Sequence, residues 1–130
     1  MKKLDVKSFC HLSKYTTLKV GGLAEFFAEP TSIEEAKFLI SWAQKENILC
    51  NIIGAGSNLL VSDNLVKGLT ISIRRINGNE FNKETGAIKV NAGESLPLLS
   101  RKAAKLGLKG LEWAAGIPGT IGGATVMNAG

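Results

Sequence analysis

Apolar residues recur at helical spacing in a segment that begins at Ser32 and runs to about Glu46. Residues three and four positions apart lie on one side of a helix, so this segment is expected to bury one face. The apolar positions of that face are Ile33, Ala36, Leu39, Ile40 and Ala43. Ser32 and Glu35 stand at capping-box spacing, so each side chain can bind a free backbone N–H of the first turn.

A second helix is expected from about Ser95, with Pro97 in the first turn, where its missing N–H does no harm. The apolar positions of its buried face are Leu96, Leu99, Ala103 and Leu106. Gly107 stands where the residue just after a helix commonly adopts the left-handed conformation. The helix is therefore expected to end at this glycine.

Short apolar runs between turn-forming residues predict strands at 24–28, 49–53, 69–73, near 80–82 and at 87–92. The run at 69–73 alternates Leu and Ile with Thr and Ser, which predicts a half-buried strand. Residues 1–22 are polar and irregular. Residues 110–130 are expected to form a glycine-rich loop, with a short helix after Gly119 as an option.

This order of elements predicts an α+β fold in one domain that covers residues 1–130. The chain divides loosely near Leu69, which gives one lobe of about 1–68 and a second of about 69–130. Neither an internal repeat nor a low-complexity linker is present.

The composition is that of a folded chain, with 45% hydrophobic and 21% charged residues and a mean hydropathy of +0.11. The net charge is +5, from 16 Lys and Arg against 11 Asp and Glu. These charges are scattered and no aromatic platform accompanies them. They are therefore interpreted as a solvated surface, and no nucleic-acid partner is expected.

Cysteine and histidine are sparse: Cys10, Cys50 and His11 show no metal-ligand spacing, so no metal site is expected. This cysteine usage suits the reducing cytoplasm, and no signal peptide is expected. Residues 113–130 carry no charge and approach the length of a membrane span. They contain Pro118 and five glycines, however, so they are expected to form a loop and no membrane partner is expected.

The first candidate for chemistry is the turn at 54–58, Gly-Ala-Gly-Ser-Asn, which follows a predicted strand. Glycines let a backbone approach a phosphate closely, and N–H groups then point at its oxygens. The dinucleotide fingerprint needs a third glycine and a following helix, but Leu59 occupies that position. A plain hairpin turn remains an alternative for this segment.

The second candidate is 116–124, where four glycines surround Pro118 and Thr120 supplies a hydroxyl. A helix beginning after Thr120 would also suit a pyrophosphate, and the alternative is a purely structural loop. The presence of two such loops favours a phosphate-bearing cofactor. Neither a Ser/His/Asp set nor a Gly-x-x-x-x-Gly-Lys-Ser/Thr motif is present, so a cofactor would carry any chemistry.

These motifs follow one another at 16–22, 24–26, 54–61, 107–112, 116–124 and 127–130. In this order they closely resemble the UDP-N-acetylenolpyruvoylglucosamine reductase family, also called UDP-N-acetylmuramate dehydrogenase. The likeness covers the chain from about residue 10 to the end. The run of linked motifs is specific, whereas each motif alone is not.

The resemblance implies a two-lobed FAD-binding domain of the vanillyl-alcohol-oxidase (PCMH) type, with non-covalent FAD between the lobes. It assigns cofactor contacts, chiefly through backbone N–H groups, to two loops and to the segment after them. Thr17 is a weaker assignment. The assigned residues are Ile53, Gly54, Ala55, Gly56, Ser57, Asn58, Leu59, Gly116, Ile117, Pro118, Gly119, Thr120, Gly122, Gly123, Ala124, Asn128, Ala129 and Gly130.

The implied reaction passes hydride from NADPH to FAD and then to the enolpyruvyl group of a UDP-sugar, giving UDP-N-acetylmuramate for peptidoglycan synthesis. In the family the catalytic arginine, serine and glutamate lie beyond the Asn-Ala-Gly motif, so no catalytic residue is assigned in this chain. The domain is expected to be incomplete at the C-terminus, to lack the substrate-binding domain and to be inactive alone.

Two other interpretations of these glycine loops remain open. The same loops suit a non-catalytic nucleotide-binding or regulatory module, and a basic α+β interaction domain would use them only structurally. The oligomeric state is left undetermined by the sequence.

Overall fold

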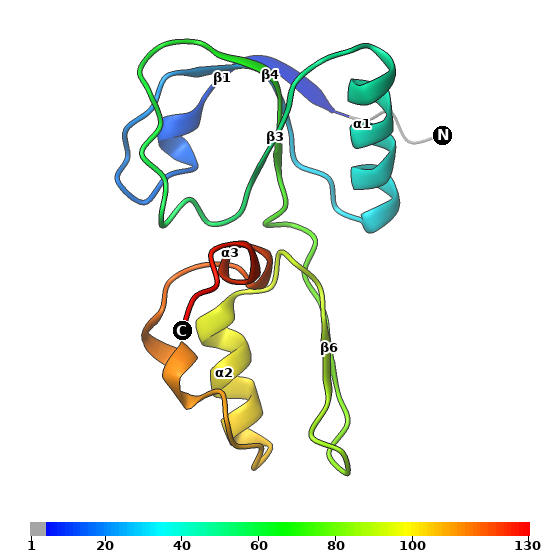
Figure 1. Cartoon of the computed structure of the whole chain (residues 1–130), viewed down its shortest axis with the longest axis vertical. Coiled ribbons are helices and arrows are strands. Elements are labelled where there is room, and N and C mark those ends of the chain that lie inside the picture. Colours follow the sequence, from blue (N-terminus) through cyan, green and yellow to red (C-terminus); the bar gives the residue numbers. More distant parts are fainter. Residues whose placement is uncertain (1–4) are drawn as a thin grey trace.

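The computed structural model describes residues 5–130, which form two lobes (Figure 1). One lobe holds a four-stranded sheet in the order β1-β2-β4-β3 together with α1, and the other holds α2, α3 and the hairpin of β5 and β6. The elements are β1 (Val6–His11), the 3-10 helix η1 (Leu12–Lys14), β2 (Leu23–Ala28), α1 (Ile33–Lys45), β3 (Cys50–Ile53), β4 (Val66–Ser72), β5 (Asn79–Phe81), β6 (Ile88–Val90), α2 (Leu96–Lys105), the 3-10 helix η2 (Glu112–Gly116) and α3 (Ile121–Val126).

Strand β4 is central to the sheet, because β2 and β3 both pair with it in parallel while β1 pairs antiparallel with the outer side of β2. The expectation of a half-buried strand here is wrong: Leu69, Thr70, Ile71 and Ser72 are each 1% exposed or less. A strand that has neighbours on both sides, and both faces covered, buries its polar positions together with its apolar ones.

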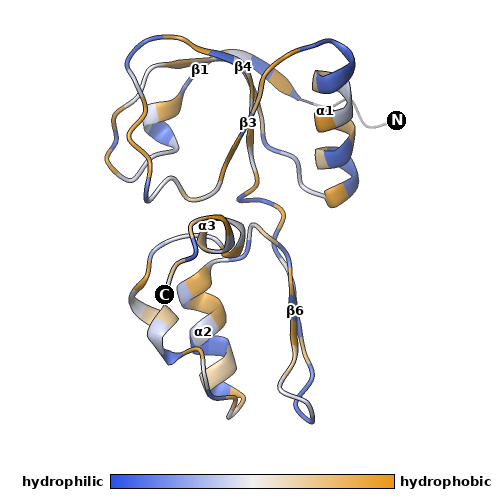
Figure 2. Cartoon of the chain, in the orientation of Figure 1, coloured by the Kyte–Doolittle hydropathy of each residue, from blue (hydrophilic) through white to orange (hydrophobic). Residues whose placement is uncertain are grey.

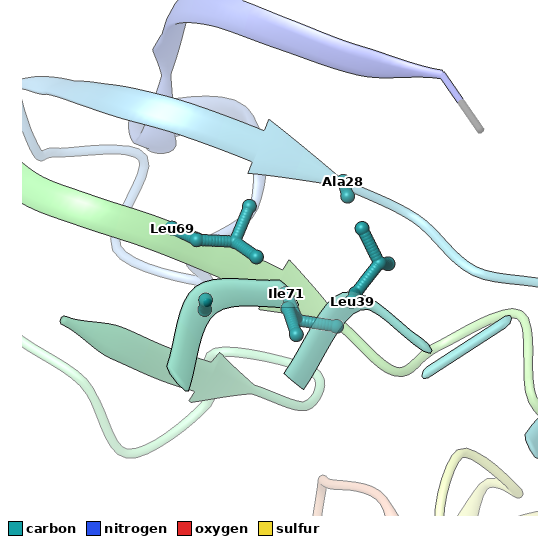
Figure 3. Close-up of a cluster of buried hydrophobic side chains, with 5 residues drawn as sticks. Ala28, Leu39, Leu69 and Ile71 are labelled. Carbon is teal, nitrogen blue, oxygen red and sulfur yellow. The ribbon is translucent and has the colours of Figure 1, made fainter. Parts of the chain in front are cut away.

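Two apolar clusters stabilise this lobe. On the α1 side, Leu39 of the helix packs over Ala28, Leu69 and Ile71 of the sheet (Figure 3). The second cluster is formed by Leu12, Ala24, Phe27 and Ile53. The sheet is therefore a layer between α1 and the segments that follow β1 and β3.

Helix α1 begins where the sequence predicts, because the Ser32 Oγ accepts a hydrogen bond from the Glu35 amide at 3.1 Å. The Glu35 carboxylate binds the Thr31 amide at 2.7 Å, one residue before the expected partner. Apolar and polar stretches alternate along the helix (Figure 2). Ile33 is expected on the buried face but is 45% exposed: it is the first helical residue, and the buried residues of α1, Leu39 and Ala43, lie further along the helix.

Helix α2 confirms the second prediction, with Pro97 in its first turn and Gly107 just beyond its end at φ +77°. Leu106 was expected to be buried but is 36% exposed. It lies one residue past the last helical residue, where the chain turns away from the buried face.

The N-terminal segment corrects another expectation, since Val6–His11 forms β1 and was expected to be irregular. The strand lies at the edge of the sheet and most of its side chains are exposed, so its mixed sequence of polar and apolar residues carries no burial pattern. Residues 1–22 are called the N-terminal arm below, and residues 1–4 of it lie outside the described residues.

The connection between the lobes follows β4. The break expected near Leu69 falls inside that strand, and the first sheet extends to Ser72. The strands expected near 80–82 and at 87–92 are the hairpin of β5 and β6. The optional helix after Gly119 is present as α3.

The Thr70 and Ser72 hydroxyls are buried and, within residues 5–130, have no hydrogen-bond partner. Thr70→Val is expected to stabilise the protein by about 1 kcal/mol, because it removes an unsatisfied hydroxyl at nearly constant volume. Urea unfolding measures the change. Thr16→Val is the matched control, because buried Thr16 donates to the Val20 carbonyl at 2.8 Å and its loss should destabilise. Destabilisation by both substitutions would contradict this interpretation.

Candidate functional site

The two glycine loops singled out in the sequence meet between the lobes. The Ser57 hydroxyl donates to the Pro118 carbonyl at 2.9 Å, across 61 positions of sequence. Gly54 lies against Thr120 so closely that a Cβ at Gly54 would overlap the Thr120 Oγ1. The folding of two separate lobes therefore brings together loops that the sequence treats as independent motifs.

The turn at 54–58 carries free backbone donors. Within residues 5–130, the amides of Ala55, Gly56, Ser57 and Asn58 donate no hydrogen bond to the protein. Gly56 adopts φ +67°, and a Cβ there would overlap the Tyr15 carbonyl oxygen and lie 2.9 Å from the Thr16 Cα. Consecutive free amides in a turn that contains a left-handed residue are a suitable binding site for an anion.

The amides at the start of α3 are occupied. Those of Ile121 and Gly122 donate to the carbonyls of Glu94 and Ala92 at 2.9 and 2.8 Å. The Gly123 amide donates to the Thr120 Oγ1 at 3.2 Å. These N–H groups hold the second loop against the segment before α2, and the assignment of this loop to cofactor contacts stays a prediction.

The N-terminal arm packs behind the first turn. The Thr17 amide donates to the Gly56 carbonyl at 3.1 Å. The Tyr15 hydroxyl donates to the Glu29 carboxylate at 3.2 Å, and its pKa is raised to about 12 by burial and by the negative charge of Glu29. Tyr15 is thus a protonated donor at neutral pH, and the arm fixes the conformation of the turn.

A cavity of about 750 Å³ lies beside the two loops. Its wall includes two cations, Arg74 and Lys102, that belong to neither glycine motif. Since they come from the turn after β4 and from α2, only the fold brings them near the glycines. The lining residues are Ala55, Arg74, Asn77, Gly78, Asn79, Gly93, Glu94, Ser95, Pro97, Leu98, Lys102, Pro118, Gly119 and Thr120.

Glu94 is the buried acid of this cavity, at 7% exposure. Its carboxylate accepts hydrogen bonds from the Gly78 amide at 2.9 Å and from the Lys102 Nζ at 3.2 Å. Burial acts to raise the pKa of Glu94, but the bonds from Gly78, Asn79 and Lys102 outweigh it and hold the pKa below its usual value. Glu94 therefore connects the start of the hairpin to α2 through charge-assisted hydrogen bonds.

We expect stability to fall in acid solution through Glu94. Its pKa is lower in the folded than in the unfolded protein, where a glutamate titrates near pH ~4.3. The stabilisation of the fold by ionised Glu94 is thus complete above that pH. It is lost as the pH falls through the pKa that Glu94 has in the folded protein. Glu94→Gln should reduce the pH dependence measured by urea unfolding between about pH 6 and 3. The exposed Glu84→Gln is the control, and equal behaviour of the two variants would argue against this role.

Other residues assigned to the cofactor differ in accessibility. Ile53 is 9% exposed and belongs to the apolar core, so only its backbone can face a ligand. Asn58, Gly116 and Pro118 are exposed, as are Asn128 and Gly130 after α3. The remaining assigned residues, Ala55, Ser57, Ile117, Gly119, Gly122, Gly123, Ala124 and Ala129, are partly buried, and Leu59 is 39% exposed.

The uncharged C-terminal segment contains the short helices η2 and α3. Among residues 5–130, no helix is long and apolar enough to span a bilayer. The same residues contain no group of three or more His, Cys, Asp or Glu side chains able to hold a metal ion.

The chain is similar in sequence to a known domain family and to known proteins. Residues 24–130 match a family described as an FAD binding domain. UDP-N-acetylenolpyruvoylglucosamine reductase of Prochlorococcus marinus strain NATL2A is 52% identical over 130 residues, which are 100% of this chain and 45% of that protein. The same enzyme of Synechococcus sp. strain WH7803 is 54% identical over 119 residues, which are 92% of this chain and 38% of that protein.

Solved structures give the same result. The crystal structure of the Thermus caldophilus reductase has a TM-score of 0.73 and 36% identity, covering 98% of this chain and 43% of that chain. 6-Hydroxy-D-nicotine oxidase from Arthrobacter nicotinovorans, at 14% identity and a TM-score of 0.62 over 81% of this chain and 24% of that chain, shares the fold. The expected resemblance and the expected α+β fold of the vanillyl-alcohol-oxidase type are thereby confirmed. The chain spans 38–45% of the length of the two curated relatives named above.

Proposed function

The chain belongs to the FAD binding domain family, and from this we propose that it is the FAD-binding part of a UDP-N-acetylenolpyruvoylglucosamine reductase. The proposed enzyme converts UDP-N-acetylglucosamine enolpyruvate to UDP-N-acetylmuramate, with NADPH as the hydride source. The cofactor is bound non-covalently between the two lobes. This assignment rests on relatives of that name whose sequences match this chain over its full length.

The free amides of the turn at 54–58 are the observation that carries the proposal. A diphosphate is an anion with several acceptor oxygens, and backbone N–H groups bind it without the cost of ordering side chains. Gly56 has the left-handed conformation, and Gly54 lies against Thr120 with no room for a Cβ, so glycine is what allows this turn its shape. The residues present therefore fit the phosphate-bearing part of FAD.

Bound FAD supplies the redox chemistry, accepting a hydride and passing it on. This chain's own residues bind and orient the cofactor. The turn at 54–58 holds the phosphates, while the loop at 116–120, fixed to α2 by the bond from the Leu96 amide to the Gly119 carbonyl at 3.0 Å, shapes the adjoining wall. No catalytic residue is assigned within this chain.

The proposal is tested by titrating FAD into the purified chain and following flavin fluorescence and visible absorbance. We expect saturable binding, with a yellow protein that retains FAD through gel filtration and releases it on denaturation, as non-covalent binding requires. Lumichrome, which has the flavin ring system but no phosphate or adenosine, is the control and should bind more weakly. A protein that shows no saturable FAD binding would refute the proposal.

We also propose that the enzyme acts in the cytoplasm on a UDP-sugar. Cys10 and Cys50 are free thiols in the structure, and free thiols are usual for proteins of reducing compartments. Alkylation of both cysteines by a thiol reagent, in cells lysed under trapping conditions, would support this location; a disulfide between chains would count against it.

A further inference from the structure

Two adjacent arginines occupy opposite sides of one turn. The chain leaves β4 at Ser72 and turns at once, closed by a hydrogen bond from the Ile76 amide to the Ile73 carbonyl at 2.9 Å. Arg74 lines the cavity beside the glycine loops. Arg75 lines a separate cavity of about 170 Å³ near the start of α1. One turn thus gives two neighbouring cations different surroundings.

The charges around the two arginines differ. Arg75 shares its cavity with the carboxylates of Asp5, Glu29 and Glu35 and with one other cation, Lys7. Among the described residues that line the cavity of Arg74, only Glu94 carries a carboxylate, and it is already bonded to Lys102 at 3.2 Å. Across residues 5–130, neither Arg74 nor Arg75 takes part in an ion pair, but only Arg75 has several carboxylates beside it. The positive charge of Arg74 is therefore the one that the protein leaves uncompensated at this cavity.

The cavity has the size and the donors for a nucleotide. Ligand pockets for molecules of this class have volumes of about 300–1,000 Å³, and this one measures about 750 Å³. Ala55 of the first glycine turn and Gly119 of the second loop belong to the same wall as Arg74. A guanidinium group suits phosphate oxygens because it can donate two parallel hydrogen bonds.

We propose that Arg74 is a phosphate-binding residue of the FAD site, with its guanidinium group on the diphosphate held by the turn at 54–58. Glu94 fixes Lys102 in place, so that Lys102 contributes less to this contact. The inference rests on the proposed function for the identity of the ligand. It adds to that function a charged side chain which the glycine motifs do not contain.

The test compares Arg74→Gln with Arg75→Gln, the neighbouring substitution of the same charge and size on the other side of the turn. Isothermal titration with FAD, ADP and riboflavin measures the affinities, and thermal unfolding checks that both variants fold. Arg74→Gln is expected to weaken FAD and ADP about tenfold, the order of one charge-assisted hydrogen bond, and to leave riboflavin unchanged. It should also make FAD binding less sensitive to KCl. Arg75→Gln should match the unsubstituted chain.

Equal FAD affinity for Arg74→Gln and the unsubstituted chain would overturn the inference. An equal loss in Arg74→Gln and Arg75→Gln, or an equal loss for FAD and riboflavin, would also overturn it, because neither result depends on a phosphate at Arg74. Failure of the unsubstituted chain to bind FAD would refute the proposed function. In that case the ADP titration decides the inference. ADP binding that is weakened by Arg74→Gln but not by Arg75→Gln supports a phosphate contact at Arg74. If the unsubstituted chain binds no ADP, that contact is excluded.

Discussion

Gly56→Ala is expected to weaken FAD binding by more than tenfold and to destabilise the fold by roughly 3 kcal/mol. Gly56 has φ +67°, and a Cβ there would overlap the Tyr15 carbonyl oxygen. A left-handed alanine costs about 1–2 kcal/mol, and forcing atoms into a packed site costs about 1–3 kcal/mol more. The turn must also move away from Thr17, whose amide binds the Gly56 carbonyl. FAD titration and urea unfolding measure the two effects.

Gly86→Ala is the control that measures the cost of a left-handed alanine alone, without the steric overlap that a Cβ at Gly56 would cause. Gly86 has φ +72°, nearly that of Gly56, but a Cβ there meets nothing within 4 Å. We expect this control to lose about 1–2 kcal/mol and to bind FAD like the unsubstituted chain. If both variants behave alike, the contact between Gly56 and the arm is not what shapes the turn.

Phe27→Ala is the second large effect, with an expected loss of about 3–5 kcal/mol of unfolding free energy. The ring is fully buried at 0% exposure, and its centroid lies 4.3 Å from that of Tyr15. The cavity left by its removal would lie beneath the arm that supports the glycine turn. Because domains of this size are stable by only about 5–15 kcal/mol, we expect a marginal fold with reduced FAD affinity.

Phe38→Ala is the matched control for this loss, since Phe38 lies on α1 at 52% exposure. It should change stability by less than about 1 kcal/mol. Urea unfolding of both variants measures the difference. A similar loss in the two variants would mean that Phe27 does not have the buried role that its surroundings indicate.

Local signals in the sequence predicted the helices well. Ser32 is the N-cap of α1. Pro97 lies in the first turn of α2, and Gly107 follows its last turn. Each of these signals depends only on residues a few positions away in the sequence. The two glycine loops were also recognised, because glycine at a turn has a local physical meaning. Their assignment to FAD contacts stays a prediction for the titration and the Gly56 variants.

The features that sequence reasoning missed depend on distant neighbours. The segment of β1 is a strand only because β2 offers it an edge, and Thr70 is buried only because strands lie on both sides of β4. Arg74 and Arg75 are adjacent in the sequence, and nothing in that pair indicates that one turn would direct them to different cavities. The occupied amides of α3 likewise depend on carbonyls from 92 and 94.

The position of β4 has a consequence for synthesis on the ribosome. Of the four strands of its sheet it is the last to be made, yet it is inserted between β2 and β3. Until Ser72 has emerged, β2 and β3 each lack the strand beside which they lie, and α1 lacks Leu69 and Ile71 beneath it. Only β1 and β2 can pair early. The nascent lobe therefore assembles in one cooperative step when its middle arrives, and exposes two unpaired strand edges to chaperones until then.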